Sequence, residues 1–166
     1  MKKITLLTAI IALTFSSCAT KMIKKSPAEV KIMSTKQYET SKALVFKSII
    51  SLLQSESYLI DQTDKETGLI RASMRIENRN ATLQKMLLDY SKDATIFKVA
   101  FYIEDINPSL SEVKITIYKG VISSGYGKQG HLYGNNSENM VYDVRVYNDW
   151  FNKLRAEIER RKALTY

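Results

Sequence analysis

Apolar residues recur at helical spacing in two segments, residues 35–55 and 144–163. Positions three or four apart lie on one side of a helix, so both segments are predicted to be amphipathic helices packed on another element. Ser34 and Gln37 match a capping box before the first helix. Asp143 precedes the second helix, where its carboxylate can accept hydrogen bonds from free backbone N–H groups.

Apolar and polar residues alternate in three further segments, 69–77, 95–104 and 113–118. Alternation with a period of two is typical of strands that have one buried and one solvated face. A shorter apolar run at 58–61 is also predicted to be a strand. The turn residues at 107–109, Asn-Pro-Ser, favour a hairpin between the two strands that flank them.

Residues 78–92 have a weaker helical pattern. Leu83, Met86, Leu87 and Tyr90 are spaced as on one side of a helix, and Asn80 could cap it. We therefore predict a short helix here.

Residues 120–139 are predicted to be a long loop. Five of the six glycines lie between positions 120 and 134, with Tyr126, His131 and Tyr133 among them. Loops of this length are either functional or simply mobile.

The element order predicts an α+β fold: a helix, two strands, a short helix, two strands and a last helix. Each long helix has one apolar side, and each strand has one buried and one solvated face. The simplest packing is two layers, with helices on one face of a four-stranded antiparallel sheet. Residues 35–163 are predicted to form this single domain.

The N-terminal sequence MKKITLLTAIIALTFSS has the charged start, apolar run and small residues of a signal peptide, residues 1–17. Its apolar run is shorter than the roughly 20 residues that span a membrane. The tetrad that ends at Cys18 looks like a bacterial lipobox, so we expect Cys18 to be lipidated; a plain secretory signal is the alternative. Residues 18–34 would then be the lipidated N-terminus and tether, kept flexible because Pro27 blocks a helix.

Composition and charge indicate a folded domain with a basic surface. The hydrophobic fraction of 45% allows a packed core. The net charge is +8, or +6 without the first 17 residues, which favours anionic surfaces. Nucleic acid is not an expected partner, because an exported protein rarely meets it.

The sequence offers no set of residues for catalysis or metal binding. The only histidine, His131, and the only cysteine cannot form a nitrogen and sulfur metal site. No GxSxG nucleophile motif is present, and the acidic residues at 61–66 are interpreted as a solvated turn. We therefore predict no enzyme activity, no cofactor and no metal.

Two groups of residues are candidates for binding a partner. Tyr126, His131 and Tyr133 lie among glycines, a combination that is typical of adaptable contact surfaces. Arg160 and Arg161 stand at the basic end of the last helix. These five residues are the predicted partner-binding residues.

Three passages carry a resemblance to a known group of proteins: the lipobox at Cys18, residues 41–72 and residues 142–158. Together they resemble small envelope lipoproteins of Gram-negative bacteria with a helix-grip-like domain, such as a lipoprotein component of the outer-membrane β-barrel assembly machinery. The resemblance implies a non-enzymatic accessory or scaffold module in cell-envelope assembly or maintenance. An aspartate after the lipidated cysteine resembles an inner-membrane retention signal, and its replacement by Ala19 suggests the outer membrane, facing the periplasm; the inner membrane and the cell surface are the alternatives. The alternative is a periplasmic domain that binds a lipid or a small amphiphile.

Overall fold

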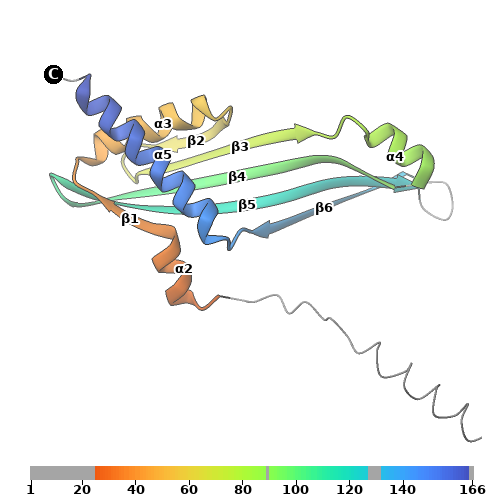
Figure 1. The fold of residues 1–166 in the computed structure, drawn as a ribbon, viewed down its shortest axis with the longest axis horizontal. Helices are drawn as coiled ribbons and strands as arrows, with labels where there is room; N and C mark the ends of the chain where they lie inside the picture. Colours follow the sequence, from red (N-terminus) through yellow and green to blue (C-terminus); the bar gives the residue numbers. More distant parts are fainter. Residues whose placement is uncertain (1–24, 89, 127–131, 165–166) are drawn as a thin grey trace, which may run out of the picture.

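The computed structural model describes residues 25–164, except residue 89 and residues 127–131 (Figure 1). Its elements follow in chain order: α2 (Pro27–Ser34), β1 (Thr35–Tyr38), α3 (Lys42–Ser55), β2 (Leu59–Asp64), β3 (Leu69–Glu77), α4 (Ala81–Leu88), β4 (Tyr90–Asn107), β5 (Leu110–Tyr126), β6 (Leu132–Met140) and α5 (Val144–Ala163). Within this part of the chain, none of the helices combines the length and the apolar character needed to cross a membrane.

The strands form one six-stranded antiparallel sheet in the order β2-β3-β4-β5-β1, and β6 also pairs with β5. β4 and β5 have 18 and 17 residues, so each runs for about 60 Å. β1 pairs with residues 111–114 of β5 and β6 pairs with residues 118–126. Since β4 occupies the other side of β5, β1 and β6 follow one another along the same edge.

The hydrophobic core lies at one end of this sheet. α3 and α5 lie together over the end where β1 and β2 are found (Figure 1). Phe101 on β4 is fully buried, and its ring meets the Trp150 ring of α5 edge to face at 5.7 Å. The Tyr38 hydroxyl, on β1, donates a hydrogen bond to the carbonyl of Phe151 at 3.1 Å. We call this compact part of the molecule the body.

Beyond the body, the sheet continues as an arm, which we define as residues 74–98 and 118–140. It consists of the end of β3, α4, the first half of β4, the last part of β5 and all of β6. Figure 1 shows the arm extending past α3 and α5, with α4 at its far end. The main buried cluster of the described residues takes its members from the body alone.

The predicted four-stranded, two-layer fold is wrong. The sheet has six strands, and the four described helices do not form one layer on one face: α2 lies beside β1, and α4 lies at the end of the arm. The two missed strands, β1 with 4 residues and β6 with 9, both pair with the free edge of β5. β6 includes the sequence GNNSEN, which has low strand propensity, so only the neighbouring strand makes it extended.

The N-terminal predictions also need correction. The capping box is formed by Ser26 and Glu29, not by Ser34 and Gln37, and Pro27 occupies the first turn of α2. Proline is well tolerated there, because the missing N–H would have no helical partner. Met33 and Ser34 are buried, so the folded domain begins within the predicted tether rather than at residue 35.

Other element predictions are confirmed. The strand at 69–77 and the helix at 144–163 have the predicted bounds, and a short helix lies within 78–92. The Asp143 carboxylate accepts a hydrogen bond from the backbone N–H of Arg145 at 2.9 Å, as expected of a cap. Residues 35–55, in contrast, are not one helix, because residues 35–38 form β1 and the helix begins at Lys42.

Glu157 on α5 is expected to make folding stability depend on acid pH. Arg160 and Arg161 donate hydrogen bonds to its carboxylate at 2.7 and 2.9 Å, and its pKa is lowered to about 2, chiefly by Arg160. A lowered pKa stabilises the fold above pH 4.5 and less as the pH falls toward 2. We expect Glu157→Gln to lose about 1 kcal/mol near neutral pH and almost nothing near pH 2.

Urea unfolding of both proteins across this pH range measures the difference. A loss that stays constant with pH would contradict the assignment.

Candidate functional site: the apolar end of the arm

α4 exposes the apolar side chains that a helix normally buries. Leu83 is 57% exposed, Met86 80%, Leu87 72% and Leu88 70%. No residue of this helix is buried. The predicted helical spacing is therefore confirmed, but its apolar side faces outward rather than into a core.

The polar side of α4 is the side held against the strands. Gln84 and Lys85 are partly covered, and the Gln84 side chain accepts a hydrogen bond from Asn78 at 3.0 Å. Asn78 also donates to the carbonyl of Lys92 at 2.7 Å, and its backbone N–H donates to the carbonyl of Asp93 at 2.8 Å. These bonds fasten the helix to the start of β4 and leave the opposite side free.

Asp93 adds an electrostatic contact to this attachment. The nearby hydroxyls of Ser124 and Ser91 lower the pKa of its carboxyl, and the Ser91 hydroxyl donates a hydrogen bond to it at 2.5 Å. The ionised carboxylate lies 3.9 Å from the Lys85 ammonium. One charged residue in the first half of β4 therefore links α4, β4 and β5.

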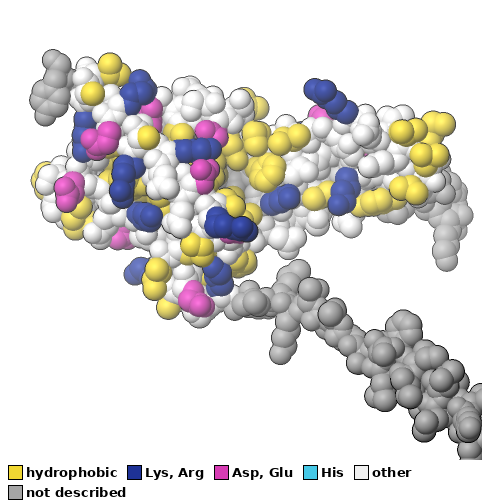
Figure 2. Space-filling model, viewed as in Figure 1, with side chains coloured by type: hydrophobic (Ala, Val, Ile, Leu, Met, Phe, Trp, Pro, Cys, Tyr) yellow, Lys and Arg dark blue, Asp and Glu magenta, His cyan; other side chains and the backbone are white. Residues whose placement is uncertain are grey.

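The exposed apolar surface continues onto the strands beside α4. Ile76 near the end of β3 is 51% exposed and Tyr90 at the start of β4 is 41% exposed. Figure 2 shows hydrophobic side chains gathered at this end of the molecule. We call the six residues the apolar tip: Ile76, Leu83, Met86, Leu87, Leu88 and Tyr90.

The structure places two of the predicted contact residues next to the apolar tip. In the strand register, Tyr90 lies opposite Gly125, and Gly125 lies opposite Tyr133. Tyr126 is the next residue of β5, opposite Leu132. The predicted loop at 120–139 is thus mostly the β5–β6 hairpin, and the loop prediction is wrong for these strands.

The other predicted residues are elsewhere. Arg160 and Arg161 lie in the last turn of α5, at the opposite end of the molecule from α4 (Figure 1). The arginines and the tyrosines therefore do not form one surface. Cys18 and His131 lie outside the described residues.

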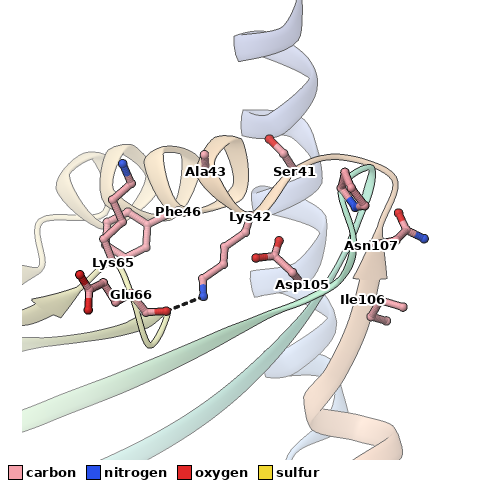
Figure 3. A pocket seen from close by; sticks show the side chains of 10 residues that line it. Ser41, Lys42, Ala43, Phe46, Lys65, Glu66, Asp105, Ile106 and Asn107 are labelled. Carbon is pink, nitrogen blue, oxygen red and sulfur yellow. Dashed lines mark hydrogen bonds between the residues drawn. The ribbon is translucent and has the colours of Figure 1, made fainter.

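Two hollows elsewhere on the molecule have a mixed polar lining. One, about 610 Å³, lies between the start of α3 and two strand turns (Figure 3). There the Lys42 ammonium donates to the carbonyl of Glu66 at 2.8 Å, with Lys65 and Asp105 nearby. This hollow is wide open to solvent.

The second hollow, about 500 Å³, is lined by side chains of the sheet, including Arg71, Lys98, Tyr118 and Glu138. Two of its lining residues, Lys98 and Glu138, form an ion pair at 2.8 Å. Within the described ranges, no three His, Cys, Asp or Glu residues are grouped to hold a metal ion.

Comparisons with known proteins give little further information. No family model matches the chain, and no curated protein is significantly similar. Among solved structures, a DUF4468 family protein from Bacteroides ovatus ATCC 8483 is similar with a TM-score of 0.37 and 12% identity, over 81% of this chain and 96% of that one. A likeness this distant supports no argument about function.

Proposed function

We propose that the protein is a membrane-tethered envelope lipoprotein that works as a non-enzymatic accessory or scaffold module, with the arm as its contact element. Acyl chains on Cys18 would hold it at the outer membrane, facing the periplasm. The proposal takes the lipobox from the sequence and the arm from the structure.

The observation that carries the proposal is that the arm adds nothing to the main core. Among the residues whose burial is described, the buried cluster contains none of α4 or β6 and none of β5 beyond Ile117. The arm instead ends in exposed apolar side chains, and such surfaces usually mark interaction sites in soluble proteins. The structure of the arm is therefore explained better by contact with another surface than by stability.

The β5–β6 hairpin at the end of the arm is the proposed contact with a partner protein. Tyr126 and Tyr133 lie in these strands, and residues 134–139 of β6 are exposed. A lipid tether would raise the effective concentration of this surface near other envelope proteins. A modest contact area is then sufficient for function.

Crosslinking in living cells tests this role. The full-length, tagged protein is compared with a Cys18→Ala variant and with a variant in which an Asn-Gly turn replaces residues 124–134. Because Ser123 pairs with Asn135, this turn closes the shortened hairpin in register. We expect both changes to abolish capture of one defined envelope complex.

Leu59→Ser is the matched control, because Leu59 is 76% exposed on β2 in the body. Its capture should equal that of the wild type. Capture that survives hairpin shortening would remove the arm from the mechanism, and capture of abundant background proteins alone would contradict the accessory role.

The second hollow supports an alternative function, binding of a small amphiphile. Tyr118 and the partly covered Ala100 and Thr116 offer an apolar floor, with Arg71 and Lys98 at its border. Native mass spectrometry of the purified protein should then show an added mass. A clean apo mass would exclude a copurifying ligand.

A further inference from the structure

We propose that the apolar tip inserts into the lipid bilayer, as a second attachment point in addition to the acyl anchor. This inference deepens the proposed function and relies on it only for the nearness of a membrane. In this inference the outward side of α4 contacts the membrane, whereas the β5–β6 hairpin contacts the partner protein.

The chemistry of the apolar tip matches the boundary of a bilayer. Four of its side chains are leucine or methionine on a helix of 8 residues, which is about 12 Å long. An amphipathic helix can lie in a membrane interface with its apolar side about 5–10 Å deep. Tyr90, at the edge of the patch, has the amphipathic ring that is enriched at this depth.

The apolar tip is much smaller than a protein interface that is stable without a tether. It comprises six residues, whereas a standard interface uses roughly 20–30 residues on each side. A second copy of this chain, packed tip to tip, would therefore bury too little surface. A bilayer has no such requirement, because each inserted side chain gains transfer free energy independently.

The charges around the apolar tip favour anionic lipid. Arg79 and Lys92 are exposed next to it and form no ion pair with any described residue. Of the neighbouring acids, Glu77 and Asp93 each have a cationic partner, Arg75 and Lys85, and Asp89 lies outside the described residues. Within the described part of the chain, Arg79 and Lys92 therefore remain available to lipid headgroups, which attract basic residues at membrane surfaces.

The dimensions allow the anchor and the apolar tip to reach one membrane. From Cys18 to Ser26, eight peptide steps extend to at most about 28 Å. Along β5, the pairing with β1 at Lys114 and the pairing with Tyr90 at Gly125 are eleven residues apart, or about 37 Å. A protein held at both points would lie with its long sheet along the bilayer.

Vesicle sedimentation tests the inference without the acyl anchor. The chain from residue 18 onward, with Cys18→Ser, is mixed with vesicles of phosphatidylethanolamine and phosphatidylglycerol. We expect binding, and we expect Leu87→Ser to weaken the partition coefficient about tenfold. Adding Leu83→Ser and Met86→Ser should reduce binding to background.

Two control variants replace apolar residues of the body that are as exposed as those of the apolar tip. Ile32 and Leu59 are 79% and 76% exposed, so Ile32→Ser and Leu59→Ser should bind vesicles as the wild type does. Urea unfolding of every variant verifies that the fold is intact, since substitutions at exposed positions cost little stability.

A tryptophan reporter tests insertion directly. The native Trp150 is buried in the body and gives a constant background. Met86→Trp should show a blue shift of its emission when vesicles are added, whereas Leu59→Trp should not. An unshifted Met86→Trp spectrum would overturn insertion.

Three other results would also overturn the inference: no vesicle binding by the parent chain, a concentration-dependent dimer that the serine substitutions abolish, or envelope capture through α4 without vesicle binding. None of these results affects the crosslinking test of the proposed function, which uses the shortened β5–β6 hairpin. Vesicle binding with no captured complex would instead reject the proposed function and keep the inference.

Discussion

Replacing Gly68 by alanine is expected to destabilise the fold more than any other single change proposed for this protein. Gly68 has a φ of +78°, and a Cβ atom there would lie 2.1 Å from the carbonyl oxygen of Ile103. The Ile103 N–H donates a hydrogen bond to the carbonyl oxygen of Gly68 at 3.0 Å. The backbones of β4 and of the turn before β3 are therefore in direct contact at this position. An added methyl group must push two backbones apart, at a cost of about 3–5 kcal/mol.

Such a loss is a large share of the roughly 5–15 kcal/mol by which domains are stable. Urea unfolding followed by circular dichroism measures it. Gly134→Ala is the matched control, because the nearest atom to a Cβ there is the Ser123 carbonyl oxygen at 3.9 Å. Gly134→Ala should change the free energy of unfolding by less than about 0.5 kcal/mol, and an equal loss at both glycines would contradict the argument.

Phe101→Ala should have the second largest effect, a loss of about 3–5 kcal/mol. Phe101 is fully buried between the sheet and α5, and alanine leaves a cavity beside Trp150. Tyr102→Ala is the control, because the neighbouring side chain points to the other face of β4 and is 45% exposed.

Equilibrium unfolding in urea compares the two variants. We expect the midpoint to fall strongly for Phe101→Ala and slightly for Tyr102→Ala. Equal effects would mean that burial against α3 and α5 does not distinguish the two faces of the sheet.

Local sequence patterns correctly predicted elements that pack one apolar face into the main core. β3 and α5 have a periodic apolar face that packs in the body, and Asp143 caps α5 as its sequence position predicted. In these elements the same residues that give the pattern also make the tertiary contacts. Local preference and global packing agree there.

The candidate site was the least predictable part. Leu83, Met86 and Leu87 gave the correct helix, but the spacing of residues cannot say whether a core exists on the apolar side. The tyrosines of the hairpin were recognised as a contact region, but they were placed in a loop because glycine and asparagine have low strand propensity.

The sequence alone determined the periodic elements, the likeness of the N-terminus to a lipoprotein signal, and the lack of a recognisable catalytic or metal motif. Only the tertiary structure decided that β1 and β6 share the free edge of β5, that the sheet extends beyond its helices as an arm, and that α4 turns its apolar side outward. The physical reason is that strand pairing and burial depend on partners distant in the chain. A residue pattern reports the face that an element offers, whereas the fold decides what covers that face.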